Sequence, residues 1–343
     1  MKKRLLVLSL CLTMVLSLVA CGNTGGSDKI KVGMVTDVGG VNDGSFNESS
    51  WAGLKKAEEE FDIEVKYLES ANDADYTPNI ESFMDEDYDL IISVGYMLAD
   101  ATRAAAEANP DQKFAIIDDS SIELPNVTCL MFEQAQASYL VGVVAGMTTE
   151  SNTVGFVLGM ENATMNEFGY GYVAGVLDAN PDANVLQINA NSFGDPAIGK
   201  SSAVTMITEG ADVIFHAAGG TGRGVIEACV ENDIYAIGVD SDQNSLAPDH
   251  VITSAMKRVD VATYDVAKDC LEDKLDGGVR VYDLTTGGVD IAPTTNLLTE
   301  DVVKEIEDIK KKIIDGDIEV PKTKDAFEAA HGDVYVLDAE DAE

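Results

Sequence analysis

The chain has 343 residues, of which 45% are hydrophobic, so it is long enough for about two domains with ordinary hydrophobic cores. Its formal net charge is −38, and the acidic residues are spread along the chain rather than gathered in a tail. A surface this acidic repels the phosphates of nucleic acids and the headgroups of anionic lipids. We therefore expect neither a nucleic-acid partner nor a basic face that binds membranes.

The N-terminus has the pattern of a secretory signal. Basic residues at positions 2–4 precede an uncharged run over 5–20. That run is short for a membrane-spanning helix, which needs about 20 residues, and it fits the apolar part of a signal peptide. The run ends in Leu18-Val19-Ala20-Cys21, followed by a polar, glycine-containing stretch over 22–27. This segment resembles a bacterial lipobox, in which cleavage before the cysteine frees its thiol and its amine for acylation.

Cys21 is therefore the predicted lipidation site. We expect a lipoprotein signal peptide over 1–20 and a lipid-anchored linker over 21–29. The mature chain would carry 20 basic and 61 acidic residues, a net charge of −41. A diacylglyceryl group with acyl chains such as palmitate is enough for stable anchoring, and it would hold the protein on the outer face of the cell membrane. The alternatives are an ordinary signal peptide with a chance cysteine and an anchor that is not cleaved.

Cys11 would leave with the signal peptide. The three cysteines that remain besides Cys21 and the histidines show no metal-ligand spacing, so neither a metal site nor a cofactor is expected. The three cysteines cannot all pair, and their apolar surroundings favour buried free thiols over a disulfide framework, with one bridge as the alternative. These residues are Cys129, Cys229, Cys270, His216, His250 and His331.

Strand-like and helix-like segments alternate regularly after the linker. In the first half, strands are predicted at 31–36, 63–68, 89–94, 114–117 and 127–132, and helices at 51–61, 80–84, before Asn109 and at 136–147. The pattern then restarts, with strands at 153–158, 184–188, 211–215, 235–239 and 251–256, and helices at 168–177, 198–207 and 225–230. Two such series predict an α/β fold of two doubly wound parallel-sheet domains with helices on both faces.

The end of the chain adds a helix at 261–275, a strand at 279–284 and an amphipathic helix with apolar positions from Leu298 to Ile313. Elements added after both sheets allow the chain to recross between the domains. We therefore expect a hinge made of several crossovers, with a ligand cleft beside it. The predicted lobes are 30–147 with 261–290 (N-terminal lobe) and 148–260 with 291–335 (C-terminal lobe), followed by an acidic tail over 336–343.

The loops that leave the carboxyl ends of parallel strands line the ligand crevice in such folds. The first of these loops is Thr36-Asp37-Val38-Gly39-Gly40-Val41-Asn42-Asp43-Gly44-Ser45-Phe46-Asn47. It offers the carboxylates of Asp37 and Asp43, amides and an aromatic ring as candidate ligand contacts. The alternative is an ordinary turn, in which Asn47 or Ser49 caps the next helix and Phe46 forms a hydrophobic staple.

Polar groups recur at the other strand ends. Phe46 facing Phe193 across a cleft would sandwich a flat ring. Asp240 with Lys257 would suit vicinal hydroxyls, which donate to a carboxylate and accept from an ammonium. A single aspartate is more commonly a cap, but recurrence at several strand ends predicts a site. The segments that follow the later strands are Asp118-Asp119-Ser120, 191–196, 217–224, 238–243 and Lys257.

Three of these segments together resemble the signature segments of a known family. They are 36–47, 218–225 and 238–243, and they are similar to those of the basic membrane protein family of lipoproteins, the PnrA-like and TmpC-like purine nucleoside-binding proteins of ABC importers. The resemblance implies the fold of type I periplasmic binding proteins, with an aromatic ring on each face of the base. The ligand contacts that it implies are Phe46 and Phe193 on the base, Asp37 and Asn47 at its edge, Asp118, Asp240 and Lys257 around the ribose, and the backbone of Gly220.

The expected function is capture without chemistry, so no enzyme activity is predicted. A purine nucleoside of the inosine, guanosine and adenosine class would enter the cleft, and the closed form would dock on the permease subunits of an ABC transporter. A nucleotide-dependent dehydrogenase is a weaker interpretation, because Gly220-x-Gly222-x-Gly224 lacks the GxGxxG spacing. A nucleoside hydrolase would need a tighter acidic cluster than Asp37 and Asp43. A sugar- or furanone-type signal-binding protein of the same fold remains the alternative within the class.

Overall fold

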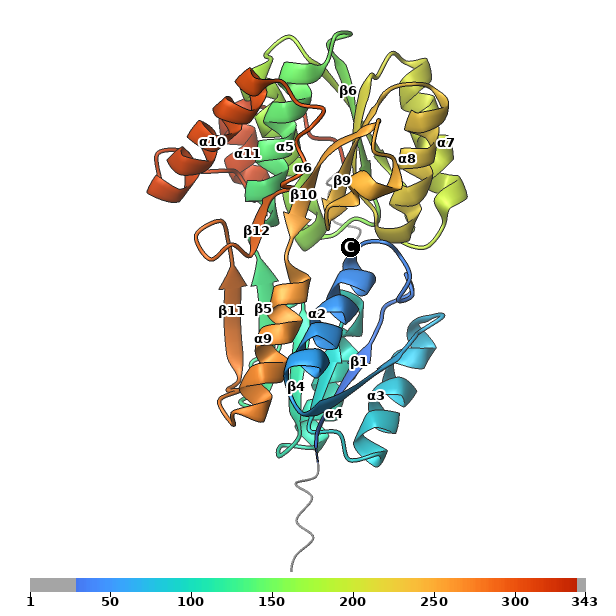
Figure 1. The fold of residues 1–343 in the computed structure, drawn as a ribbon, viewed down its shortest axis with the longest axis vertical. Coiled ribbons are helices and arrows are strands. Elements are labelled where there is room, and N and C mark those ends of the chain that lie inside the picture. Colours follow the sequence, from blue (N-terminus) through green and yellow to red (C-terminus); the bar gives the residue numbers. More distant parts are fainter. Residues whose placement is uncertain (1–28, 338–343) are drawn as a thin grey trace, which may run out of the picture.

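The computed structural model describes residues 29–337. The predicted signal peptide, Cys21, nearly all of the predicted linker and residues 338–343 of the acidic tail lie outside this range. Within it, the chain forms two lobes, each built around a six-stranded sheet, and the lobes stand end to end in Figure 1. None of the helices within residues 29–337 is long and apolar enough to cross a membrane.

The first sheet has the strand order β11-β5-β4-β3-β1-β2, and every pairing in it is parallel. Residues alternate between its faces: Leu90 and Ile92 belong to one hydrophobic cluster and Ile91 to another. Both faces are therefore covered, as the uninterrupted apolar run predicts. The strands are β1 (Ile30–Val35), β2 (Ile63–Leu68), β3 (Leu90–Ser93), β4 (Lys113–Ile117), β5 (Val127–Phe132) and β11 (Gly278–Tyr282).

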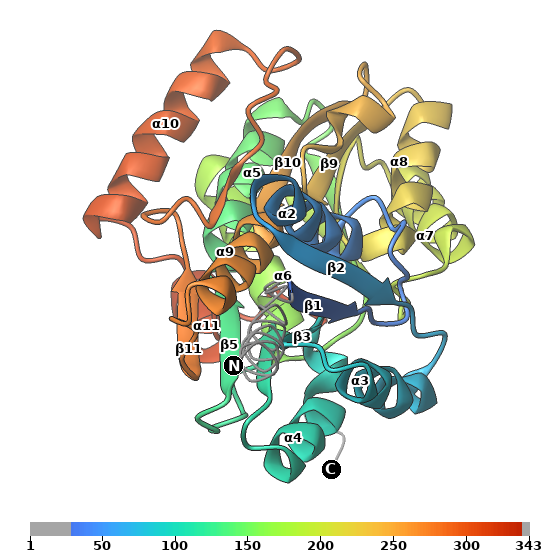
Figure 2. The ribbon, with the colours of Figure 1, turned by 60° about the horizontal axis from the view of Figure 1, so that its bottom comes forward.

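Helices cover both faces of this sheet. Figure 2 shows α2 (Phe46–Glu60) and α9 (Val259–Leu271) on one side and α3 (Tyr76–Asp85) and α4 (Ala99–Ala108) on the other. The backbones of α2 and α9 approach closely, because a Cβ on Gly53 would lie 2.0 Å from the carbonyl oxygen of Asp260.

The second sheet repeats this topology in the order β12-β10-β9-β8-β6-β7. Its edge strand differs, because β12 pairs antiparallel to β10, whereas β11 pairs parallel to β5. The strands are β6 (Thr153–Leu158), β7 (Asn184–Asn189), β8 (Val213–Ala217), β9 (Tyr235–Asp240), β10 (Val251–Lys257) and β12 (Val289–Ile291). The predicted α/β class with two doubly wound parallel sheets is confirmed.

The helices of the second lobe are α5 (Gln134–Thr148), α6 (Ala163–Ala179), α7 (Pro196–Thr208), α8 (Gly222–Glu231), α10 (Glu300–Asp315) and α11 (Lys324–His331). The predicted apolar stripe of the last long helix is present, since α10 buries Val302, Ile306, Ile309 and Ile313. Cys129, Cys229 and Cys270 are buried and unpaired.

The predicted lobe boundary at residue 147 is wrong, because α5 belongs to the second lobe. This helix packs on α6 and on strands β10 and β12. The two helix backbones touch through glycines: a Cβ on Gly142 would lie 2.2 Å from the Tyr172 carbonyl oxygen, and one on Gly175 would lie 2.1 Å from that of Tyr139. The later boundaries also shift, since α9 begins at Val259 in the first lobe and β12 at Val289 in the second.

Three segments of the described chain cross between the lobes. They follow β5 at Glu133, β10 at Arg258 and β11 over 283–288. Backbone hydrogen bonds tie the crossovers together: the Glu133 N–H donates to the Tyr282 carbonyl at 2.9 Å, and the Arg258 N–H donates to the Gly288 carbonyl at 2.9 Å. The predicted multi-crossover hinge is therefore part of the structure, and it places the ends of β5 and β10 beside the space between the lobes (Figure 1).

Candidate ligand-binding site

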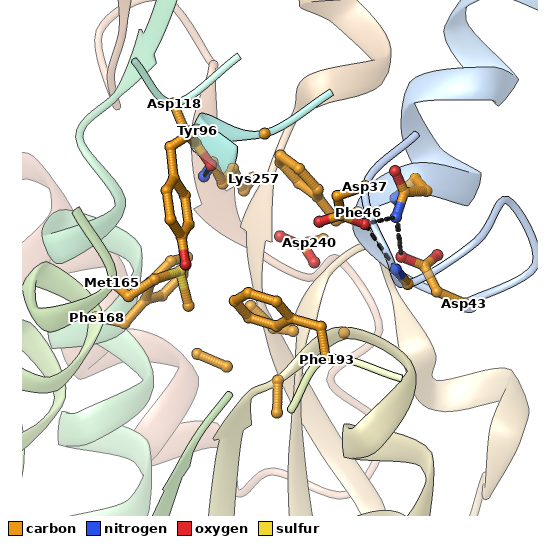
Figure 3. Close-up of a pocket in the computed structure, with 17 residues that line it drawn as sticks. Asp37, Asp43, Phe46, Tyr96, Asp118, Met165, Phe168, Phe193, Asp240 and Lys257 are labelled. Atoms are coloured by element: carbon orange, nitrogen blue, oxygen red, sulfur yellow. Dashed lines mark hydrogen bonds and ion pairs between the residues drawn. The ribbon is translucent and has the colours of Figure 1, made fainter. Parts of the chain in front are cut away.

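A cavity of about 510 Å³, counting the space at its mouth, lies between the lobes. The carboxyl ends of strands from both sheets converge on it, which is where ligands bind in open parallel sheets. Figure 3 shows its lining side chains.

The first lobe contributes a network of two carboxylates around one amide. The Asn47 Nδ2 donates to Asp37 Oδ1 at 2.8 Å and to Asp43 Oδ2 at 3.3 Å. Asp37 also accepts the Gly39 N–H at 2.8 Å. Because both carboxylates accept hydrogen bonds from the amide nitrogen, the oxygen of Asn47 must point the other way. This Oδ1 is buried and has no hydrogen-bond partner among residues 29–337.

Asp43 has a second role, as the cap of helix α2. Its carboxylate accepts the backbone N–H groups of Ser45, Asn47 and Glu48 at 2.9, 2.9 and 3.0 Å. This satisfies donors that the first turn of a helix leaves unpaired. The alternative in which Asn47 or Ser49 caps this helix is therefore wrong, and the amide of Asn47 is left for the cavity.

Lys257 and Asp118 form a buried ion pair between the lobes. The Nζ–Oδ2 distance is 2.5 Å, and the side chains are 2% and 6% exposed. The ammonium also lies 5.1, 5.2 and 5.4 Å from the ring centroids of Phe46, Phe132 and Phe168. Asp118 Oδ1 is buried and has no partner within the described chain, so it remains available as an acceptor.

Asp118 and Asp240 occupy equivalent places in the two sheets. Asp118 follows β4 and Asp240 ends β9, and each strand is third from the β11 or β12 edge. Both residues have left-handed backbones, with φ of 66° and 64°. This conformation is uncommon outside glycine and is concentrated at functional sites.

The cavity is strongly acidic. Burial raises the pKa of Asp37 to about 6 and that of Asp240 to about 7, and it also raises the pKa of Asp43. These carboxylates accompany Asp118 around a single ammonium, Lys257, among the cavity lining. An anionic ligand would be repelled here, whereas a neutral ligand rich in N–H and O–H donors would meet acceptors on several sides.

Aromatic side chains from both lobes form the apolar walls. Phe46 stands at the start of α2 and Phe193 in the loop after β7, and Figure 3 shows both rings in the cavity. The Phe193 ring packs closely on Gly159, where a Cβ would lie 2.4 Å from the ring. Tyr96 reaches in from η2 (Tyr96–Leu98), with its hydroxyl toward Met165.

Of the predicted contacts, all but Gly220 line the cavity. The residues brought together are Asp37, Asp43, Phe46, Asn47, Asp118, Phe193, Asp240 and Lys257. Gly220 is buried one residue beyond the lining position Gly219, and a Cβ on it would meet the Phe193 carbonyl oxygen at 3.2 Å. The glycine loop therefore supports Phe193 and presents Gly219.

Sequence reasoning missed Tyr96, Met165 and Phe168. Tyr96 lies two residues beyond the predicted strand 89–94, so the rule applied to the other strand ends would have found it. Phe168 was placed at the start of a predicted helix, but α6 begins at Ala163, capped by Asn162 Oδ1, which accepts the Met165 N–H at 2.8 Å. The additional turn brings Met165 and Phe168 to the cavity.

This arrangement defines a solute-binding protein of two lobes with a ligand site between them. The chain belongs to the family described as ABC transporter substrate-binding protein PnrA-like, whose model matches residues 30–324. It is thus a substrate-binding protein of ABC transporters.

Curated relatives span nearly its whole length. The chain is 39% identical to the CD4+ T-cell-stimulating antigen of Listeria innocua, over 94% of this chain and 99% of that protein. It is 36% identical to the ABC transporter nucleoside-binding protein BmpA of Lactococcus lactis, again over 94% and 99%. It is 37% identical to basic membrane protein A of Borreliella burgdorferi, over 90% and 94%.

Solved structures agree on the fold. A solute-binding protein of an ABC transporter system from Aeropyrum pernix K1 matches with a TM-score of 0.80 and 28% identity, over 88% of this chain and 96% of that chain. An arabinose-binding protein from Geobacillus stearothermophilus matches with a TM-score of 0.58 and 14% identity, over 81% and 99%, which shows a common fold alone.

Proposed function

We propose that the protein captures nucleosides, purine nucleosides in particular, for an ABC importer. The observation that carries this proposal is the pairing of two aromatic walls from opposite lobes with acceptors at both ends of the cavity. The name of the Lactococcus lactis relative, a nucleoside-binding protein, supports the same ligand class.

The base would lie between Phe46 and Phe193. Stacking of a base on an aromatic side chain contributes about 1–3 kcal/mol in single-stranded nucleic-acid binders, and two rings should contribute at least comparably. Asn47 Oδ1 and the carboxylate of Asp37 would accept N–H groups at the edge of the base. Hypoxanthine and guanine present such donors, which favours inosine and guanosine, with adenosine in the same class.

The ribose would lie at the Lys257 end of the cavity. Asp118 Oδ1 and the Asp240 carboxylate would accept its vicinal hydroxyls, while the Lys257 ammonium would donate to them. The surplus of carboxylates would repel a phosphate, so the proposed ligand is the nucleoside rather than the nucleotide. No reaction is assigned to these residues.

Lipid on Cys21 would hold the protein on the outer face of the cell membrane. The proposal rests on the lipobox-like segment 18–21 and on the family's place in ABC transporters. The stretch 22–27 would link the lipid to the folded lobes, and the loaded protein would deliver its ligand to the permease subunits.

Calorimetry tests the ligand class. Purified protein would be titrated with inosine, guanosine, adenosine, uridine and ribose, and we expect each purine nucleoside to bind more tightly than ribose. Phe46→Ala should weaken purine binding by about 5- to 150-fold, since one stacking wall is lost. Phe61→Ala is the matched control, because Phe61 ends the same helix and packs on Tyr264 rather than in the cavity.

Two results would overturn the proposal. Ribose binding more tightly than every nucleoside would indicate a sugar site of the same fold. Release of free base on incubation would indicate hydrolysis instead of capture.

A further inference from the structure

His216 and Gln243 form a buried polar pair that the ligand site does not use. His216 lies in β8 and Gln243 begins η4 (Gln243–Leu246), and the two residues are 0% and 2% exposed. The His216 Nε2 lies 3.1 Å from Gln243 Oε1. Burial lowers the pKa of His216 to about 4, so the ring is neutral at physiological pH.

The orientation of the Gln243 amide is fixed by groups of opposite polarity. Its Oε1 accepts the Val239 N–H at 3.0 Å, and its Nε2 donates to the Gly44 carbonyl at 2.9 Å. If the amide were flipped, its NH₂ group would face the Val239 N–H and its oxygen would face the Gly44 carbonyl. Because Oε1 is an acceptor, the facing His216 Nε2 must carry the ring hydrogen.

The surrounding chain leaves room for this pair and for little else. A Cβ on Gly238 would lie 2.5 Å from both Gln243 Oε1 and Ser254 Oγ, and a Cβ on Gly222 would lie 2.0 Å from His216 Nδ1. The Gln243 N–H also donates to Ser254 Oγ at 3.1 Å. The Gln243 side chain is therefore held in this orientation by contacts within its own lobe.

That partner is Gly44, in the loop between β1 and α2 of the first lobe. The same loop carries Asp43 and leads directly into Phe46 and Asn47 at the start of α2, so a bond to Gly44 holds this group of cavity residues against the second lobe. Ser45 donates to Asp240 Oδ2 beside it, but Asp240 lines the cavity, where a ligand would compete for its carboxylate. None of Gly44, His216 and Gln243 lines the cavity.

We propose that Gln243, held in place by His216, is a closure latch that joins the lobes through Gly44 without contacting the ligand. A contact that stabilises only the closed form changes the closing equilibrium by the same factor whatever is bound. The latch therefore scales the affinity for every ligand equally, whereas Phe46 and Asn47 discriminate between ligands. It acts after encounter, so its loss raises the dissociation rate more than it lowers the association rate.

The test compares Gln243→Ala and Gln243→Glu with wild type. The Glu variant keeps the packing against Ser254 and Gly238 but turns an acceptor toward the Gly44 carbonyl, so it reports on the latch even where the Ala variant fails to fold. Arg223→Ala is the matched control, because the exposed Arg223 donates to the Asn42 carbonyl across the same gap at 3.2 Å.

Dissociation constants and dissociation rates would be measured for inosine and uridine. In the Gln243 variants the Gly44 carbonyl has no donor in the closed form. Both dissociation constants should therefore rise by one common factor of about 5 to 50, mainly through faster dissociation. The control should change them by less than about twofold. Different factors for the two nucleosides, or unchanged affinity in both Gln243 variants, would overturn the latch.

Small-angle X-ray scattering of the ligand-free proteins separates this proposal from the proposed function, on which its nucleoside probes rest. We expect a larger radius of gyration in the Gln243 variants than in wild type, and equal radii would contradict the latch. Should wild type bind neither nucleoside, the proposed function fails and the scattering result alone decides on the latch.

Discussion

The substitution Asp118→Asn should weaken ligand binding much more than it lowers the stability of the fold. Asp118 and Lys257 are almost fully buried, with 2.5 Å between their charged atoms; Asp118 follows β4 of the first sheet and Lys257 ends β10 of the second. Asparagine retains the shape and tolerates the left-handed backbone at this position. Removing one member of a buried ion pair costs about 3–5 kcal/mol. Because the amide still accepts a hydrogen bond, we expect roughly 1.5–3 kcal/mol, the range of bonds to charged groups.

This free energy should appear in ligand binding, since the pair joins the lobes and Asp118 Oδ1 is the proposed ribose acceptor. The dissociation constant of inosine should rise by about 10- to 150-fold. The midpoint of thermal unfolding should move by less than about 3 °C. Calorimetry and thermal unfolding measure the two quantities. Asp119→Asn is the control, because Asp119 pairs with Ser121 outside the cavity. The reasoning is refuted by an inosine affinity within threefold of wild type, or by an equal loss in the control.

The remaining predictions concern pH, the stacking wall and the anchor. Burial raises the pKa of Asp240 to about 7 and that of Asp37 to about 6. A ligand hydroxyl or N–H can donate to these groups only when they are ionised, so at a pH below either pKa binding must release a proton. The affinity should therefore fall by up to about tenfold per pH unit per group as the pH drops from 7 to 5. An affinity that does not change with pH in calorimetry would contradict this. Gly159→Ala should push the Phe193 ring out of place, since the new Cβ would lie 2.4 Å from it; binding assays should show weaker nucleoside binding with thermal stability nearly unchanged, and wild-type affinity would show that the ring is not part of the site. Cys21→Ala should abolish acyl labelling and release the protein from the membrane fraction, and retention in that fraction would point to another anchor.

Strand positions and much of the site followed from local sequence patterns. Apolar runs such as Leu90–Val94 are strands buried on both faces, and parallel strands bring their carboxyl ends to one edge. Reading the residues after each strand therefore located Asp37, Asp118 and Asp240 without knowledge of side-chain positions. The same topology explains why these residues, far apart in sequence, share one cavity.

The missed features depend on contacts between distant segments. The lobe that receives α5 is decided by Gly142 and Gly175, whose missing side chains let two helix backbones touch. Likewise, Asp43 caps α2 because the loop folds back on the helix, which rules out the alternative of Asn47 as the cap. His216 showed no metal-ligand spacing, and its partner Gln243 is identifiable only from the structure.

A crystal structure of the protein grown with inosine tests the central claim most directly. The account predicts the base between Phe46 and Phe193, its edge at Asn47 and Asp37, and the ribose hydroxyls at Asp118, Asp240 and Lys257. Inosine bound with its base outside these two rings, or with its ribose at the Asn47 end, would contradict it.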